Sequence, residues 1–216
     1  RGEIRKASNS IATFNNSGTL RKTTTRTGLI GVTFNNTGTV NIERGILNFN
    51  GTYTHDNADL IIKNGDVNFT DSLILNGGSL EGNDDINVAV TNSGLLNPAH
   101  FNNTEFGRLI IEGNYTETDS ASINIQLGGY TAQTNFDQID IDGIAEFRGT
   151  LNVSLLNDFT PNLGDSFDVL TFNSRTSSSE LDFTGLEINS NLQFRPEWFD
   201  DKLTLTVVNS EPLITI

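Results

Sequence analysis

The stretch Phe-Asn-Asn-Thr-Gly-Thr-Val at residues 34–40 is a near copy of Phe-Asn-Asn-Ser-Gly-Thr-Leu at residues 14–20. The two copies lie 20 residues apart and differ only by conservative exchanges. A second pair has the same displacement, because Gly-Ile-Leu-Asn-Phe-Asn at 45–50 is followed by Gly-Asp-Val-Asn-Phe-Thr at 65–70. A fixed period of roughly 20 to 50 residues is the signature of repeat architectures. The sequence therefore predicts stacked structural repeats.

Apolar and polar residues alternate within each repeat. Leu47-Asn-Phe49 and Val67-Asn-Phe69 are two examples. A period of two is typical of a half-buried β-strand. No segment of useful length has the spacing of an amphipathic helix, since Gly and Asn interrupt every candidate window. We predict an all-β chain with almost no helix.

Short strands joined by Gly and Asn corners describe the coils of a parallel β-solenoid. The alternating aliphatic and aromatic side chains are expected to point into the rod, and their polar neighbours are expected to face water. Glycine is expected to supply left-handed backbone at each corner, and asparagine is expected to stack into amide ladders between coils.

The regularity of the repeats divides the chain. Regular solenoid repeats are predicted for residues 1–108, and residues 109–216 are predicted to be either a longer-coil continuation of the solenoid or an irregular, capping β region. The stretch from Leu192 to Val208 contains proline and aromatic residues, which suit a cap over an open strand edge. An antiparallel sandwich in this half is the main rival fold, because short strands and turns would give the same signals.

The series from Phe34 to Gly51 resembles the repeats of very large secreted bacterial proteins of the autotransporter-passenger or adhesin type. The later half is also similar to such passengers, with Leu-Ile-Ile-Glu-Gly-Asn-Tyr-Thr at 109–116 and Gly-Thr-Leu-Asn-Val at 149–153 in the order that those proteins show. The resemblance implies a right-handed parallel β-helix and a secreted or cell-surface location. It implies no catalytic or ligand-binding residue.

Charge and composition exclude several classes of function. The formal net charge is −14, yet residues 1–50 hold seven basic and two acidic residues, so the acidity lies in the remainder. Nucleic acid is not an expected partner, because most of this surface would repel a polyanion. Cysteine is absent, which excludes disulfides and thiol chemistry. No run of about 18 apolar residues occurs, so no membrane insertion by this fragment is expected.

The first residue is Arg1 and methionine is absent, which predicts that the chain is a fragment of a larger parent.

Three aspartates are the candidate metal ligands. Asp137, Asp140 and Asp142 lie in one predicted strand region, and Asp140 and Asp142 would share its outward face about 7 Å apart. Carboxylates with Asn or backbone oxygens suit a hard cation, so calcium is the possible ion. No other cofactor is expected.

No catalytic residue is predicted. His55 and His100 sit in polar, loop-like contexts and are interpreted as surface histidines, and no Gly-x-Ser-x-Gly elbow accompanies them. The carboxylate pairs Asp84-Asp85 and Asp200-Asp201 could in principle flank a sugar bond, but such pairs are too frequent here to be informative.

The sequence therefore predicts a non-enzymatic, extracellular structural or adhesive module whose partner is carbohydrate or another cell surface. The alternative is a polysaccharide-binding or polysaccharide-degrading β-helix. For carbohydrate binding, the possible stacking platforms are Tyr53, Tyr115, Tyr130 and Trp198.

Overall fold

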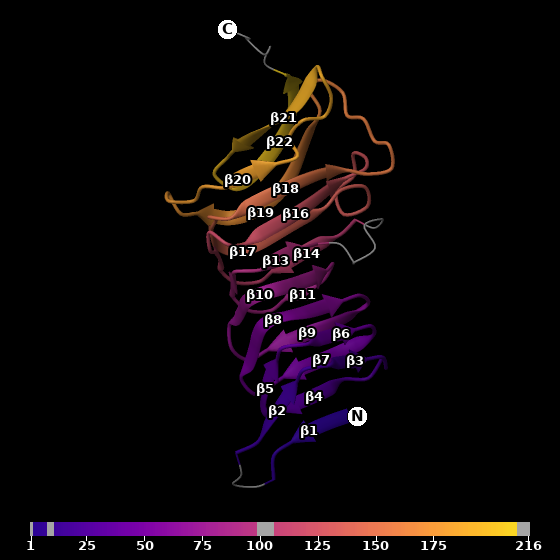
Figure 1. Cartoon of the computed structure of the whole chain (residues 1–216), viewed down its shortest axis with the longest axis vertical. Helices are drawn as coiled ribbons and strands as arrows, with labels where there is room; N and C mark the ends of the chain where they lie inside the picture. The colour runs from indigo at the N-terminus through magenta and orange to yellow at the C-terminus, as the bar shows by residue number, and fades with distance from the viewer. Residues whose placement is uncertain (1, 8–10, 99–105, 211–216) are drawn as a thin grey trace.

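A computed structural model of the chain describes residues 2–7, 11–98 and 106–210. Within these ranges it contains strands and turns and no helix, which confirms the all-β prediction, and so it holds no helix able to cross a membrane. Figure 1 shows the strands stacked along the long axis, from the N-terminal end to the C-terminal end.

The strands are β1 (Gly2–Arg5), β2 (Thr13–Asn16), β3 (Thr19–Lys22), β4 (Gly28–Gly31), β5 (Thr33–Asn36), β6 (Thr39–Ile42), β7 (Gly45–Phe49), β8 (Tyr53–Ile62), β9 (Gly65–Phe69), β10 (Leu73–Gly82), β11 (Asp85–Ile86), β12 (Val90–Asn92), β13 (Leu95–Asn97), β14 (Arg108–Ile111), β15 (Tyr115–Glu117), β16 (Ser122–Leu127), β17 (Gln138–Glu146), β18 (Thr150–Leu155), β19 (Ser166–Arg175), β20 (Asp182–Thr184), β21 (Leu192–Trp198) and β22 (Lys202–Asn209).

Strands pair in parallel with strands of the next repeat. β2 pairs with β5, which places Phe14 opposite Phe34, and β7 pairs with β9, which places Phe49 opposite Phe69. In both pairs the partner lies 20 residues later in the chain. The displacement of the two sequence repeats is therefore the register of the sheet, and the predicted parallel stacking is confirmed.

Three ladders of parallel strands run through the described residues. They are β1-β4-β7-β9-β11-β14-β17-β19, β2-β5-β8-β10-β12-β15-β17 and β3-β6-β8-β10-β13-β16-β18-β20.

The displacement between paired residues is larger in the second half of the chain than in the repeats at 14–70. Val90 pairs with Tyr115, 25 residues later, and Leu109 pairs with Ile139, 30 residues later. The added residues lie in connections such as 128–137, between β16 and β17. The ladders keep their alignment because the extra length is taken up outside the strands.

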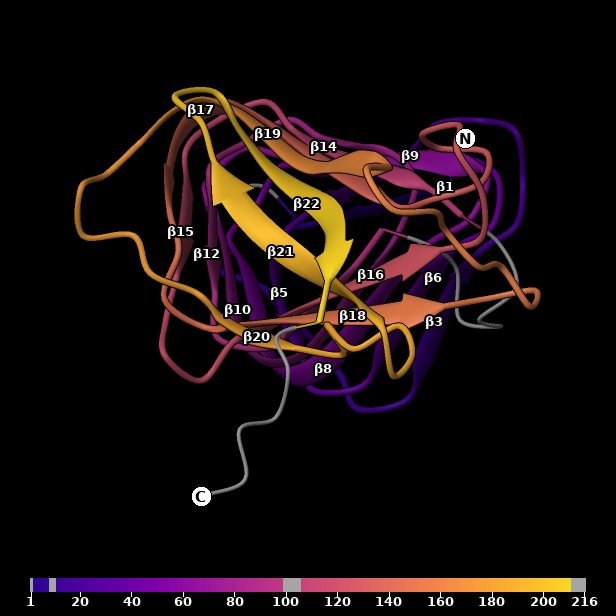
Figure 2. The ribbon, with the colours of Figure 1, turned by 90° about the horizontal axis from the view of Figure 1, so that it is seen from above.

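Antiparallel pairing occurs at the C-terminal end. β22 pairs antiparallel with β19 and with β21, whereas β18 and β20 still pair in parallel. Figure 2 shows β21 and β22 lying across the end of the stack. Pro196 is in β21, which has β22 as its only strand partner in the described ranges, and an edge strand tolerates the missing N–H of proline. The rival antiparallel sandwich is not the arrangement of this half, because parallel ladders continue to β19 and β20.

The interior is one continuous apolar cluster. Aromatic rings stack between layers, with ring centroids 5.2 Å apart for Phe14 and Phe34 and 5.8 Å apart for Phe34 and Tyr53. Residues two apart in a strand face the same side, so the period-two pattern sends one set of side chains inward in every layer.

Amide side chains form ladders on the outer face, as predicted. Asn35 Nδ2 donates to Asn15 Oδ1 at 2.9 Å, and the Thr54 hydroxyl continues this row by donating to Asn35 Oδ1 at 3.1 Å. The other outward amide pairs are Asn68 with Asn48 and Asn152 with Asn124. These bonds link layers without using the backbone.

Glycine at some turns is required for space. A Cβ atom on Gly38 would lie 2.2 Å from the carbonyl oxygen of Gly18, although Gly38 does not have a positive φ. Gly45 and Gly78 do have positive φ values, of 68° and 70°. The expectation of left-handed glycine at every corner is therefore wrong. At Gly38 the close approach of two stacked turns is the reason for glycine.

Candidate functional site

Asp137, the first predicted calcium ligand, is fully buried. Its carboxylate accepts the backbone N–H groups of Gly107 and Gln126, each at 2.9 Å. Burial raises the pKa of Asp137 to about 7, although these two N–H groups act to lower it. The side chain therefore fastens two chain segments together inside the protein and is not available at the surface.

Asp140 and Asp142 lie on the outward face of β17. Asp140 forms an ion pair with Arg108 and accepts a hydrogen bond of 2.6 Å from the Thr171 hydroxyl, whereas Asp142 is exposed. No three His, Cys, Asp or Glu side chains among the described residues are grouped so as to hold a metal ion. The structure does not bring the three predicted ligands together, and calcium binding stays a prediction for Asp140 and Asp142.

His55 lies in the interior, so its interpretation as a surface histidine is wrong. It is fully buried, and its Nδ1 atom lies 3.2 Å from the Tyr53 hydroxyl oxygen. Its backbone position pairs in register with Asn36, which is also fully buried. The alignment of Tyr-Thr-His at 53–55 with Phe-Asn-Asn at 34–36 is the sequence signal that indicates the inward position. His100 lies outside the described residues.

Four polar side chains form a chain of hydrogen bonds in the interior. Asn16 Nδ2 donates to Asn36 Oδ1 at 2.8 Å, and Asn36 Nδ2 donates to the Tyr53 hydroxyl at 3.1 Å. That hydroxyl can in turn donate to Nδ1 of His55, whose pKa is lowered to about 4 by burial. All four groups are then neutral near pH 7, although the buried Nε2 atom of His55 has no hydrogen-bond partner among the described residues. The hydrogen bonds join inward side chains of three successive layers, β2, β5 and β8.

A buried carboxyl group lies further along the same ladder. Glu117 is fully buried in β15, two residues after Tyr115, whose hydroxyl accepts a hydrogen bond of 3.1 Å from Asn92. Burial raises the pKa of Glu117 to about 7, while the backbone N–H groups of Gly149 and Arg148 and the Tyr115 hydroxyl act to lower it. Neither carboxylate oxygen of Glu117 makes a hydrogen bond of good geometry with the described residues. Burial is therefore the main influence on the pKa of this group, and it raises the pKa.

Replacing Glu117 with Gln is expected to remove a pH-dependent loss of stability. The folded-state pKa of about 7 lies above the ordinary value of 4.5, so the folded chain holds this proton where the unfolded chain releases it. The contribution of Glu117 to stability is complete below pH 4.5 and is lost as the pH rises through 7, by on the order of 3 kcal/mol. Denaturant unfolding at about pH 5 and about pH 8 measures the effect, since Glu117→Gln should gain on the parent as the pH rises.

The matched control is Glu187→Gln, because Glu187 is exposed. This variant measures how the same Glu-to-Gln exchange changes the unfolding free energy at an exposed position, at the same two pH values. Titration of His55 and Asp137 is common to all three proteins and cancels in the differences. A pH-independent difference for Glu117→Gln would show that folding does not raise the pKa of Glu117.

The four aromatic residues considered for sugar stacking have different environments. Tyr53 and Tyr115 are buried. Trp198 is partly covered by Arg175, whose guanidinium carbon lies 4.6 Å from the ring centroid. Tyr130 is 56% exposed, although its ring packs against Phe159 and Phe167.

The two predicted carboxylate pairs lie in different layers of the structure. Asp84 lies just before β11, and burial raises its pKa to about 6, with the nearby carboxylates of Asp66 and Asp85 raising it further. Asp200 and Asp201 lie in the turn between β21 and β22.

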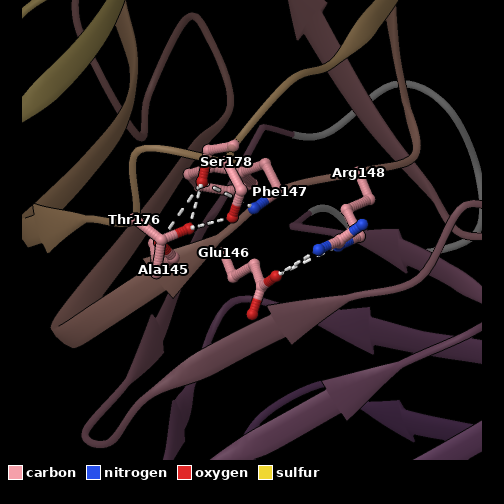
Figure 3. A network of polar contacts seen from close by, with 7 residues as sticks. Ala145, Glu146, Phe147, Arg148, Thr176 and Ser178 are labelled. Carbon is pink, nitrogen blue, oxygen red and sulfur yellow. Dashed lines mark hydrogen bonds and ion pairs between the residues drawn. The ribbon is translucent and has the colours of Figure 1, made fainter.

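A polar cleft occurs at a place that the sequence did not indicate. It is lined by Asp119, Arg148, Ser178, Glu180 and Asp182. The guanidinium of Arg148 is held by Glu146, with its Nε and Nη2 atoms 3.0 and 2.8 Å from Glu146 Oε1 (Figure 3).

Hydroxyl groups fix the turn beside this cleft. The Thr176 hydroxyl lies 3.3 Å from that of Ser178 and 3.1 Å from that of Ser179, and Ser179 Oγ accepts the backbone N–H of Phe147 at 3.1 Å (Figure 3). The cleft thus combines three carboxylates, a hydroxyl and one oriented guanidinium. These groups can exchange hydrogen bonds with a hydroxyl-rich ligand. Its residues come from the connections after β15, β17 and β19 and from the start of β20. These positions lie about one repeat of roughly 30 residues apart, so aligning the repeats of this half would have brought them together.

Comparison of the chain with models of known protein families gives no match, and comparison with curated proteins gives none. The function therefore has to follow from the residues and contacts described above.

Proposed function

We propose that this chain is a non-enzymatic, extracellular structural or adhesive module of a larger secreted or surface protein. In this proposal the three ladders close around the common core as a right-handed parallel β-solenoid. The observation that carries the proposal is the continuity of the ladders from β1 to β20 over one apolar cluster. Each interior layer is bonded to a layer on either side, which suits a stiff spacer.

The side chains favour a structural role over catalysis. Asp137 and Asp140 both have partners within the protein, and the polar row ending at His55 is buried. The exposed carboxylates contribute to the formal net charge of −14. Such a surface keeps a long β-structure soluble and disfavours nucleic acid as a partner.

The extracellular setting is proposed from the resemblance of residues 34–51 to repeats of secreted bacterial passengers and adhesins. The proposed partners are carbohydrate or another cell surface, together with the rest of a larger parent chain. The proposal includes no membrane insertion by this segment and no cofactor, with calcium at Asp140 and Asp142 the possible exception.

The alternative function is binding or degradation of a polysaccharide. The cleft around Arg148 favours it, since carboxylates and an oriented guanidinium are suited to sugar hydroxyls. In a glycosidase two carboxyl groups act on one bond, and Asp119, Glu180 and Asp182 line this single cleft.

A polysaccharide panel separates the two functions. We expect no release of reducing or unsaturated ends from any polysaccharide, and release of either product would overturn the structural proposal. Glycan-array binding is measured in parallel with Arg148→Ala and with Arg195→Ala. Arg195 forms an equivalent exposed pair with Glu197 away from the cleft, so it is the matched control. Binding that is lost only in Arg148→Ala would place adhesion in the cleft.

A further inference from the structure

Four oxygen-bearing side chains lie together on the outer face of the third ladder, in the successive strands β8, β10 and β13 (Figure 1). Asp59 of β8 pairs in register with Ser79 of β10. Glu81, also of β10, pairs in register with Asn97 of β13. Leu80 lies between Ser79 and Glu81 and belongs to the apolar core, so its two neighbours point outward. Side chains that pair in register lie side by side on one face, and we call these four residues, Asp59, Ser79, Glu81 and Asn97, the β10 oxygen cluster.

The Ser79 hydroxyl lies between two carboxylates. Its Oγ atom is 3.0 Å from Oδ1 of Asp59 and 3.1 Å from Oε1 of Glu81. A hydroxyl has one proton and donates it to one acceptor at a time. When both carboxylates are ionised, one of these two oxygens therefore receives no hydrogen bond from Ser79. The Thr39 hydroxyl is a distant donor to Asp59, because its Oγ1 atom lies 3.5 Å from Oδ2.

Two further oxygen atoms of the β10 oxygen cluster are buried and lack a donor. Glu81 is 5% exposed and Asn97 is 7% exposed. Among the described residues, neither Oε2 of Glu81 nor Oδ1 of Asn97 has a hydrogen-bond partner. A buried acceptor without a partner costs stability, and a charged acceptor costs more than a neutral one. Since the two residues are neighbours in register, one ligand can serve both oxygens.

The charge of the β10 oxygen cluster is not balanced by an ion pair within the part of the chain that the structure describes. The ion pairs there are formed by carboxylates other than those of Asp59 and Glu81. Burial raises the pKa of Glu81, the hydrogen bond with Ser79 lowers it, and the negative charge of Asp59 raises it further. Two neighbouring carboxylates without a counter-ion favour a bound cation.

We propose that the β10 oxygen cluster binds a hard divalent cation, with calcium as the ion. Calcium takes about six to eight oxygen ligands from carboxylates, amide carbonyls and water. Asp59, Glu81 and Asn97 supply carboxylate and amide oxygens, and water supplies the remainder. Ser79 donates its proton to one carboxylate while the ion neutralises both. The ion joins three successive layers of the third ladder. The inference rests on side-chain geometry and charge and is independent of the extracellular role proposed above.

The β10 oxygen cluster differs from the predicted calcium ligands Asp140 and Asp142 on β17. Asp142 is exposed, and Asp140 has Arg108 as its ionic partner and the Thr171 hydroxyl as a donor. The carboxylates of the cluster have no such basic partner among the described residues, and two of its oxygens are buried without a donor. We therefore expect calcium to bind the cluster more tightly than it binds Asp140 and Asp142.

Calcium titration of the whole chain tests the site. Metal is first removed with a chelator, and thermal unfolding is then followed by circular dichroism as calcium chloride is added. The Tm is expected to rise and then to saturate, because an ion that binds the folded chain and not the unfolded chain stabilises the folded one. Isothermal titration calorimetry gives the Kd. No rise in Tm and no saturable heat in the parent chain would overturn the proposal.

The Glu81→Gln variant locates the ion. It removes one ligand charge and keeps the shape of the side chain, so the Kd for calcium should rise at least about tenfold. Glu187→Gln is the matched control and should bind calcium as the parent does, because Glu187 is exposed and lies outside the cluster. An equal rise of Tm in Glu81→Gln and the parent would indicate general screening of the net charge of −14 and would contradict the site. Calcium binding that is lost in Asp142→Asn and kept in Glu81→Gln would place the ion at Asp140 and Asp142 instead.

The Asn97→Asp variant separates a bound ion from a purely structural role of the cluster. It adds a carboxylate of similar size beside Glu81. In the presence of chelator the variant should have a lower Tm than the parent, since a further negative charge is buried. With calcium it should bind about tenfold more tightly than the parent, because the ligand charge is larger. If Glu81→Gln changes the circular dichroism spectrum, Asn97→Asp alone decides. Calcium binding in Asn97→Asp that is no tighter than in the parent would show that Asn97 is not a ligand and would reject the site.

Discussion

The Phe34→Ala variant is expected to lose about 3–5 kcal/mol of unfolding free energy. Phe34 is fully buried, and its ring has three aromatic neighbours, with centroids 5.2 Å away in Phe14, 5.1 Å in Phe49 and 5.8 Å in Tyr53. The cavity left by the ring cannot collapse easily, because the strands on both sides of β5 hold its backbone in place. Equilibrium unfolding in denaturant measures the loss.

Phe14→Ala is the matched control for this substitution. Phe14 occupies the same position of the repeat, but it is half-buried and stacks on Phe34 alone. The variant should therefore lose less than half as much unfolding free energy as Phe34→Ala. Equal losses in the two variants would mean that the two layers are buried alike, contrary to the structure.

The Gly38→Ala variant is expected to lose at least about 1–3 kcal/mol, which is the usual range for overpacking. The new Cβ atom would lie 2.2 Å from the carbonyl oxygen of Gly18 and 2.8 Å from the carbonyl carbon of Ser17. Both contacts are with backbone atoms, which cannot rotate away as a flexible side chain could. The two stacked turns must separate, and the bonds between their layers must lengthen. Thermal unfolding followed by circular dichroism measures the effect.

Gly18→Ala is the corresponding control at the same position of the preceding repeat. A Cβ atom on Gly18 would have no atom within 4 Å, and Gly18 does not have a positive φ. This variant should be as stable as the parent or slightly more stable, since alanine restricts the unfolded chain. A large loss in Gly18→Ala, or none in Gly38→Ala, would contradict the packing of the turns.

Each of these two pairs of variants compares an interior layer with the N-terminal layer, which contains β2 and β3. Phe34 and Gly38 are covered by a neighbouring layer on each side, whereas Phe14 and Gly18 have such a layer on one side only. The stability measurements therefore test the difference in packing between an interior layer and the N-terminal layer. They do so without any ligand.

The strands and their pairing in the first half could be predicted from the sequence. Phe34 is the copy of Phe14 in the next repeat, and Phe69 is the copy of Phe49. Each copy pairs in register with its original, because identical residues stack when each repeat is one layer. The inward and outward faces also followed, since side chains alternate along a strand. Amide ladders between coils were also predicted, and the row through Asn15 and Asn35 is one of them.

The candidate site could be predicted far less well. The sequence predicts Asp137 as a possible calcium ligand, yet its carboxylate is buried and accepts the N–H groups of Gly107 and Gln126. The polar neighbours of His55 predict a surface position, although its register with Asn36 places it inside. Local sequence around each residue looks polar, and only the pairing partner reveals the direction of the side chain.

The sequence by itself determined the all-β class, the 20-residue register and the alternation of faces in the early repeats. These features depend on local periodicity, and the same local rule acts in every layer. The tertiary structure alone decided the cleft around Arg148, the burial of Glu117 and the antiparallel pairing of β19, β22 and β21. Such features depend on contacts across connections of variable length, whose path is fixed by packing against other layers and leaves no periodic signal in the chain.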